Sequence, residues 1–311
     1  MSLGVKTQKS TCQTFRDILS KAIYNSNVLH SHSKGDCDKN VIPRVLTPSD
    51  IESFVDRGFC MLRGAFTSQQ AAAACDCLWR RMEEKTGIRR SDPNTWPDSY
   101  DIEEHLTNPE VLACFSDSVA AAVEQLVGHG RWLGERRWGF WPVSFSYGAD
   151  LPYDYPSHSW HIDGNWFRHT IDCPKQGLLV IGLFTEIQPR WGGTIVAGGS
   201  HKLTARVLAR HPEGMTHTDL FKEVMNEPLG NFHEITGEVG DVALGHPFLF
   251  HCRGYKHGGP PRIISNTEAG LREPMNLRRL NFDDYSPLER SIVQAIAEEP
   301  VVPENPRFCR F

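Results

Sequence analysis

Two side chains that commonly bind metals, His161 and Asp163, lie two positions apart in the segment 157–165. On an extended strand, residues i and i+2 project to the same face. The imidazole and the carboxylate can therefore reach one cation while Ile162 points away, and Gly164 lets the chain turn directly afterwards. Alone, the His-x-Asp pattern is weak evidence for a metal site, because it more often marks a strand end with polar surface residues.

A second segment contains the residues that would complete such a site. His251 ends the run that begins at Gly240, and Arg262 follows eleven positions later. If residues 254–261 form a turn, His251 and Arg262 lie on adjacent antiparallel strands that face one pocket. Two histidines and one carboxylate are the ligand set typical of non-haem iron(II) oxygenases. The planar guanidinium of Arg262 would hold a carboxylate with two hydrogen bonds beside that metal; the alternative is a surface salt bridge.

Other histidines and polar residues compete for the site or could surround it. His158 and His246 lie at odd spacings from the ligand candidates, so on a strand they would face the other side. His201 follows Gly-Gly-Ser, where a capping or packing role is favoured, and His169 is a further alternative ligand. The substrate pocket is expected to include residues that follow the carboxylate, with Trp166 as readily a core aromatic as a pocket residue: Asn165, Arg168 and Trp166.

Taken in order, these motifs resemble the phytanoyl-CoA dioxygenase-like family of iron(II)/2-oxoglutarate-dependent dioxygenases over about residues 45–290. The matching pieces are Leu46-Thr47-Pro48 with Arg57-Gly58-Phe59, Trp160-His161-Ile162-Asp163-Gly164, Gly192-Gly193-Thr194 with Gly199-Ser200-His201, Gly240-Asp241-Val242, and the His251 to Arg262 pair. The resemblance implies iron(II) held by His161, Asp163 and His251. It also implies 2-oxoglutarate, whose far carboxylate pairs with Arg262, and a reaction with O2 that hydroxylates a small-molecule substrate and releases succinate and carbon dioxide.

The chain departs from the family pattern beside the distal histidine. Many members carry a small hydroxyl residue two positions after it, where it helps to bind the far carboxylate, whereas this chain has Arg253. Arg253 either adds a second cation to the co-substrate site or points outward, and Thr194 is a further candidate co-substrate contact. The presence of Asp163 argues against a halogenase, because those relatives lack the carboxylate.

The elements that must position these residues can be read from capping residues and hydrophobic patterns. Helices are predicted at residues 47–57, 67–85, 109–127 and 287–299. Strands are predicted at residues 59–62, 138–147, 178–184, 239–244, 248–251 and 262–265. Short strands separated by Gly and Pro indicate a sandwich or jelly roll. The family resemblance implies that this fold is a double-stranded β-helix. The fold class is therefore mainly β with flanking helices.

The layout predicts a flexible tail at residues 1–40 and a single domain over 41–311. Within that domain we expect a helical part at about 47–128, the β-helix core at about 132–285, and the closing helix at 287–299. The predicted tail is polar, without periodicity and without the apolar region of a signal peptide.

Composition excludes several classes of protein. The 311 residues carry 33 basic and 38 acidic side chains, a net charge of -5, which gives no electrostatic reason to expect nucleic-acid binding. The longest apolar stretches, such as 177–184, are too short to span a membrane. Nine cysteines without a Cys-x-x-Cys pair argue against disulfides or a thiolate zinc site. Without a targeting signal, including a peroxisomal one at the C-terminus, the cytoplasm is the expected location.

Three alternatives to an oxygenase stay open at this point. A cupin-like metal-dependent hydrolase or isomerase would use the same ligands, but Arg262 would then have no assigned role. A non-catalytic module could retain the β shell, although it need not keep three ligands and the arginine. A nucleic-acid demethylase would share the chemistry, but the acidic charge balance disfavours it.

Overall fold

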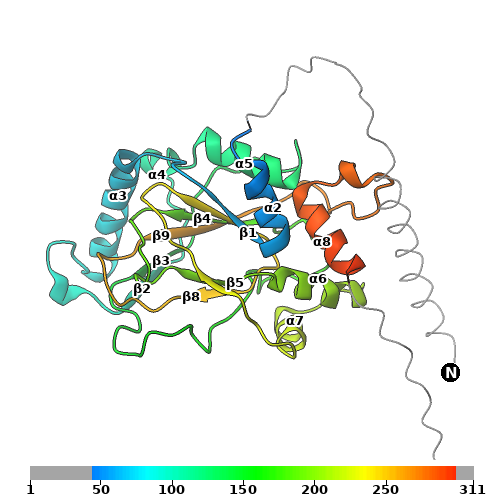
Figure 1. Cartoon of the computed structure of the whole chain (residues 1–311). Helices are drawn as coiled ribbons and strands as arrows, with labels where there is room; N and C mark the ends of the chain where they lie inside the picture. Colours follow the sequence, from blue (N-terminus) through cyan, green and yellow to red (C-terminus); the bar gives the residue numbers. More distant parts are fainter. Residues whose placement is uncertain (1–43, 299–311) are drawn as a thin grey trace, which may run out of the picture.

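The computed structural model describes residues 44–298, so the expected tail at 1–40 lies outside the described residues. The helices are α2 (Pro48–Arg57), α3 (Ser68–Thr86), α4 (Pro109–Leu112), α5 (Asp117–Val127), α6 (Ser200–Arg210), α7 (His217–Val224) and α8 (Pro287–Ala297). The strands are β1 (Phe59–Leu62), β2 (Ser99–Ile102), β3 (Trp141–Ser144), β4 (Leu178–Leu183), β5 (Thr194–Ala197), β6 (Phe232–Glu234), β7 (Val242–Gly245), β8 (His251–Arg253) and β9 (Ile264–Ala269). Figure 1 shows the strands in the middle of the molecule with helices around them.

Local hydrogen bonds account for the ends of several helices. The Thr47 side chain accepts from the Asp50 amide, and the Asp50 carboxylate accepts from the Thr47 amide, which is a capping box. Helix α2 ends at Gly58, whose φ of 86° is strained for other residues. Equivalent boxes begin α3 at Thr67 and α8 at Ser286. The three helices begin where they were predicted; α8 ends at Ala297, and the predicted end at residue 299 lies outside the described residues.

The single helix predicted at 109–127 is wrong, because the structure has two helices there. Helix α4 ends at Leu112, and Ser116 caps α5 by accepting a hydrogen bond from the Val119 amide. The Ser116 hydroxyl also donates to the Ala65 carbonyl at 2.6 Å. Side-chain hydrogen bonds of this kind offer the backbone an alternative to continuing the helix. As a result Leu112, expected in the core, is 36% exposed.

The strands form antiparallel sheets. One sheet has the order β1-β7-β4-β9, another has the order β6-β5-β8, and β2 pairs with β3. An isolated bridge between Ser144 and Arg262 places the end of β3 beside β9, and a second between His161 and His251 places residue 161 beside β8. The described residues therefore combine helices with antiparallel sheets, as the predicted class requires.

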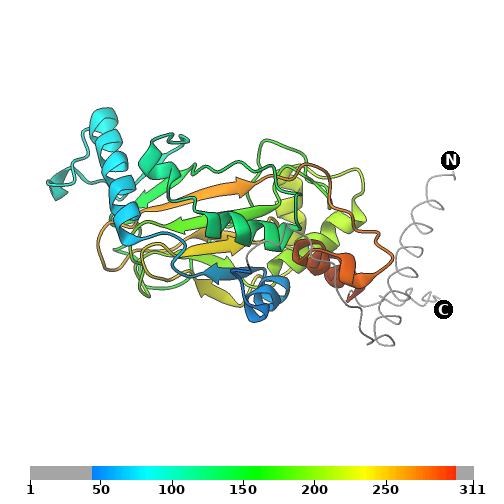
Figure 2. The ribbon, with the colours of Figure 1, turned by 90° about the horizontal axis from the view of Figure 1, so that it is seen from above.

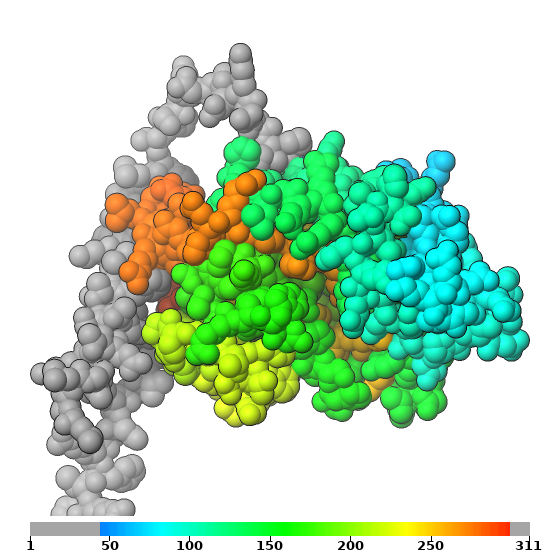
Figure 3. Space-filling model, turned by 180° about the vertical axis from the view of Figure 1, so that it is seen from behind, coloured from blue at the N-terminus to red at the C-terminus, as the bar shows by residue number. Residues whose placement is uncertain are grey.

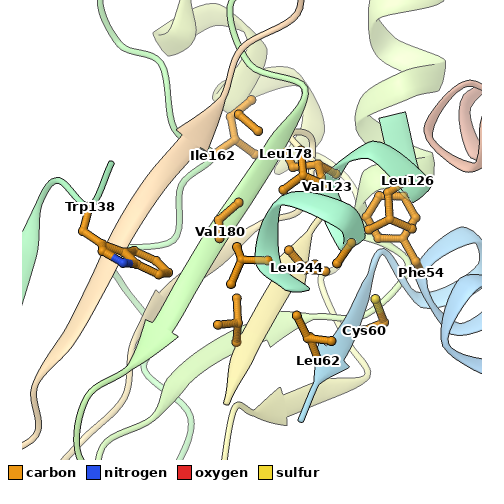
Figure 4. Packing of buried hydrophobic residues seen from close by; sticks show 14 of the residues in the cluster. Phe54, Cys60, Leu62, Val123, Leu126, Trp138, Ile162, Leu178, Val180 and Leu244 are labelled. Atoms are coloured by element: carbon orange, nitrogen blue, oxygen red, sulfur yellow. The ribbon is translucent and has the colours of Figure 1, made fainter. Parts of the chain in front are cut away.

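The two larger sheets pack their apolar faces together. Leu179 and Ile181 from β4, Ile264 from β9 and Val196 from β5 belong to one buried cluster. The opposite face of the first sheet is covered by α5, whose Val123 and Leu126 belong to a second, larger cluster (Figure 4). Figure 2 shows α5 lying across the strands. Both faces of β4 are therefore buried, which makes it a rigid support for the β9 strand beside it.

The expected hairpin between His251 and Arg262 is wrong. Strand β8 pairs with β5, whereas β9 pairs with β4 in the other sheet. The connection at 254–261 crosses between the sheets. Its backbone is hydrogen-bonded to other segments: the Gly254 amide donates to the Gly193 carbonyl, and the Lys256 amide donates to the Tyr147 carbonyl. His251 and Arg262 are therefore associated with different sheets.

Two helices interrupt the region that was expected to contain only strands. Helices α6 and α7 lie between β5 and β6 in the sequence. A cap was recognisable at Thr216, whose side chain accepts from the Asp219 amide at the start of α7.

No helix among residues 44–298 has the length and apolar character needed to cross a bilayer.

A buried pair of histidines predicts acid-dependent unfolding. The rings of His201 and His246 lie 4.9 Å apart between centroids. Burial lowers the pKa of His201 to about 4, and burial together with His201 holds the pKa of His246 well below its ordinary value. In the unfolded chain both imidazoles bind a proton below about pH 6.5, whereas in the folded chain they stay neutral until about pH 4. Stability is therefore lost as the pH falls from 6.5 toward 4. We expect a slope of about 1.4 kcal/mol per pH unit for each imidazole.

The His246→Asn variant tests this expectation by urea unfolding at several pH values. The asparagine oxygen can accept the Phe248 amide hydrogen bond that His246 Nδ1 accepts at 3.1 Å, but it does not titrate. The slope below pH 6.5 should therefore fall by about 1.4 kcal/mol per pH unit. The exposed His129→Asn variant is the control, and equal slopes in the two variants would contradict the expectation.

Candidate metal centre

His161 and His251 face each other across one pair of backbone hydrogen bonds. His161 N donates to His251 O at 3.0 Å, and His251 N donates to His161 O at 2.9 Å. The Nδ1 atom of His161 lies 2.8 Å from the Ser159 carbonyl, and that of His251 lies 3.0 Å from the Leu249 carbonyl. Because a carbonyl can only accept, Nδ1 carries the proton in both rings, and each Nε2 keeps a lone pair for a metal.

Asp163 completes the group from the bend that follows His161. Its Oδ1 atom lies 3.7 Å from Nε2 of His161 and 3.7 Å from Nε2 of His251. Gly164 has a φ of 103°, so the predicted turn after the carboxylate is present. Ile162 is buried in the core and lies near Leu178 in Figure 4, so it points away from the ligands as expected.

The three ligand atoms suit a single ion. They lie within 4.8 Å of one another, and the described residues contain no other such group of His, Cys, Asp or Glu. His251 Nε2 is buried and has no hydrogen-bond partner within the described chain, which is costly unless something binds it. Burial lowers the pKa of His161 and His251 lowers it further, which keeps the imidazole in the neutral form that binds metals.

Arg262 is buried beside β3 with part of its hydrogen-bonding capacity unused. It is 2% exposed, and its Nη2 donates to the Ser144 hydroxyl at 2.9 Å. Its Nε and Nη1 atoms are buried and have no partner in the part of the chain that the structure describes. Burial lowers the pKa of Arg262 to about 9, and the nearby charge of Arg253 adds to that effect. A buried guanidinium with two unpaired nitrogens is suited to an anion.

Arg253 and Thr194 lie opposite each other on β8 and β5. The Arg253 guanidinium donates to the Asp101 carboxylate and lies over the Tyr147 ring, so its charge already has a partner. Thr194 is buried. Both residues stay candidates for co-substrate contacts, and the positive charge of Arg253 is compensated by the Asp101 carboxylate.

The substrate candidates lie on the segment after Asp163. Asn165 and Trp166 are exposed, and Trp166 is 67% exposed. Arg168 uses its guanidinium to bind the Glu213 and Gly214 carbonyls at 2.9 and 2.7 Å. Their contact with a substrate stays a prediction.

The competing histidines lie outside the group of three. His201 is buried in α6 and hydrogen-bonded to the Val55 carbonyl, which is the packing role expected for it. His246 packs against His201, and the exposed His158 is not part of the group. His169 contacts the loop that carries Asp163 but not the ligand atoms.

Sequence reasoning missed the partners that hold the site. Ser144 lies more than a hundred residues from Arg262 in the sequence, and no pattern links the two. His217 binds the Ile162 carbonyl at 2.9 Å from the start of α7, a helix that was not predicted. Only a capping signature at Thr216 could have placed it near a helix start.

No protein-family model matches the chain, and no curated protein matches it in sequence. Among solved structures, AviO1 from Streptomyces viridochromogenes Tue57 is 16% identical, with a TM-score of 0.47 over 76% of this chain and 99% of that chain. HygX from Streptomyces hygroscopicus, with nickel and 2-oxoglutarate bound, is 16% identical, with a TM-score of 0.47 over 73% and 88%. EctD from S. alaskensis, with 2-oxoglutarate and 5-hydroxyectoine, is 16% identical, with a TM-score of 0.45 over 78% and 80%. These likenesses are too distant to assign a function to this chain.

Proposed function

We propose that this protein is an iron(II)/2-oxoglutarate-dependent dioxygenase that hydroxylates a small-molecule substrate. The observation that carries the proposal is the combination of His161, Asp163 and His251 around one point with a buried, partly unpaired Arg262. Two imidazoles and one carboxylate leave other positions of an iron ion open. A metal-dependent hydrolase or isomerase would not need the buried cation.

The arrangement of strands supports a double-stranded β-helix as the scaffold. With the two isolated bridges included, the order on one side is β1-β7-β4-β9-β3-β2, and on the other it is β6-β5-β8 followed by residue 161. The phytanoyl-CoA dioxygenase-like branch is the relationship that the motifs favour. In such a scaffold the ligands come from one sheet and Arg262 comes from the facing sheet.

Each residue has a distinct role in the proposed reaction. His161, Asp163 and His251 hold iron(II), and Arg262, oriented by Ser144, binds the far carboxylate of 2-oxoglutarate. When bound, the metal and co-substrate supply the oxidation: a substrate C–H group, 2-oxoglutarate and O2 give a C–OH group, succinate and carbon dioxide. The chain contributes orientation, a desolvated site and compensating charge.

Anaerobic titration tests the proposal. Purified protein loaded with iron(II) should develop a visible charge-transfer band when 2-oxoglutarate is added, and admission of O2 should release succinate. A panel of small molecules would then be screened for faster succinate release. Binding of iron without any response to 2-oxoglutarate would instead favour the hydrolase or isomerase alternative.

A further inference from the structure

Two imidazoles outside the group of three hold the loop that carries Asp163. His217 Nε2 lies 2.9 Å from the Ile162 carbonyl oxygen, and His169 Nε2 lies 2.9 Å from the Gly164 carbonyl oxygen. Because a carbonyl can only accept, both Nε2 atoms carry a proton and donate. The peptide groups on either side of the 163–164 pair are therefore each fixed by a side chain from another part of the fold.

The Asp163 carboxylate has no such support of its own. Within residues 44–298 no side chain or amide donates a hydrogen bond to its oxygens, and its Oδ1 lies 3.7 Å from Nε2 of each of the two ligand imidazoles. A ligating carboxylate is normally held in turn by hydrogen bonds that set its direction. Here the backbone sets the direction of the Asp163 Cα–Cβ bond, and with it the positions that the carboxylate can reach. With both flanking peptide groups fixed, few combinations of φ and ψ are left for Asp163 and Gly164.

Both histidines are themselves well supported. His169 is 3% exposed, packs on Phe167 with ring centroids 4.6 Å apart, and exchanges two backbone hydrogen bonds of 2.8 Å with Met215. His217 is the first residue of α7, which is anchored by the buried Leu220. In Figure 3 the green segment after residue 150 lies directly against the yellow-green segment that contains α7.

We propose that His169 and His217 are positioning residues, which hold Asp163 in the direction that a metal requires. This inference rests on the proposed metal centre, but not on 2-oxoglutarate or on the reaction. It gives α7 and the residues before it a function, because α7 carries His217 and Met215 forms an isolated backbone bridge with His169. Neither histidine is expected to touch the ion.

The test is cobalt(II) binding to the full chain, measured by visible absorption and equilibrium dialysis. His217 is half-buried at the start of a helix, so its replacement is compatible with folding. His217→Leu should weaken cobalt binding about 10-fold or more, as losses of such supporting hydrogen bonds do. His217→Gln should restore most of the affinity, because its amide N–H can donate to the same carbonyl. His169→Leu and His169→Gln should behave in the same way.

His211→Leu is the matched control. His211 lies between α6 and α7, and its side chain binds Glu213 and Glu223 at 3.1 and 2.9 Å rather than a carbonyl of the Asp163 loop. The positioning role is overturned if His217→Leu weakens cobalt binding no more than His211→Leu does, or if glutamine gives no recovery. A wild-type chain that binds no cobalt would instead overturn the proposed metal centre. Melting temperatures of the metal-free variants separate loss of affinity from loss of folding.

Discussion

Replacement of Arg262 by methionine is expected to weaken 2-oxoglutarate binding by about 100-fold to 4,000-fold while iron binding is retained. Loss of one partner from a buried charge pair costs about 3–5 kcal/mol, which corresponds to this range of affinity. The guanidinium is 2% exposed and has two unpaired nitrogens, so little solvent competes with the bound carboxylate. The measurement is an anaerobic titration of the iron(II) protein, followed at the charge-transfer band.

A second ligand makes the Arg262→Met test specific. 2-Oxopentanoate keeps the 2-keto acid end of 2-oxoglutarate and lacks the far carboxylate. If Arg262 binds that carboxylate, wild type and variant should bind 2-oxopentanoate equally weakly. Arg136→Met removes a surface arginine paired with Asp117 and serves as the control. Equal 2-oxoglutarate affinity in Arg262→Met and Arg136→Met would remove Arg262 from the proposed site.

Arg262→Lys is expected to recover only part of the affinity. An ammonium group provides a point charge, whereas the guanidinium provides two parallel donors in a fixed geometry. Without co-substrate, Arg262→Met should melt at or above the wild-type temperature, because the variant no longer buries a charge with unpaired donors. Added 2-oxoglutarate should raise the melting temperature of the wild type more than that of Arg262→Met.

Replacement of His251 by alanine is expected to abolish tight iron binding. The loss should exceed the roughly 10–100-fold effect of removing a hydrogen-bond partner from a ligand. His251 is buried, its Nδ1 is held by the Leu249 carbonyl, and residues 44–298 contain no other group of three metal-ligating side chains that could bind the ion in its place. Metal content after anaerobic reconstitution and dialysis gives the measurement.

His158→Ala and His246→Asn are the controls for the His251 result. His158 precedes the ligand segment, and His246 lies close to His251 in the sequence, yet neither belongs to the group of three. Both control variants should retain iron at the wild-type level. Full iron occupancy in His251→Ala, or its loss in His158→Ala, would show that the ion binds through different residues.

The most informative difference between sequence and structure concerns His251 and Arg262. Their eleven-residue spacing suggested neighbouring strands of one sheet. The structure instead assigns β8 to β5 and β9 to β4, so the imidazole and the guanidinium approach from facing sheets. Strand pairing depends on partners more than fifty residues away. The residues between His251 and Arg262 therefore do not indicate which strand pairs with β8 and which with β9.

The sequence alone determined the features that depend on a few neighbouring residues. The capping boxes at Thr47, Thr67 and Ser286, and the turn at Gly164, follow from side-chain and backbone contacts within four positions. The chemical types of the site residues were likewise readable from the sequence. Their convergence, the burial of Arg262 against Ser144, and the support of the Asp163 loop by His169 and His217 were decided only by tertiary structure. These contacts join segments that lie far apart in the sequence. They form only when the two sheets pack together.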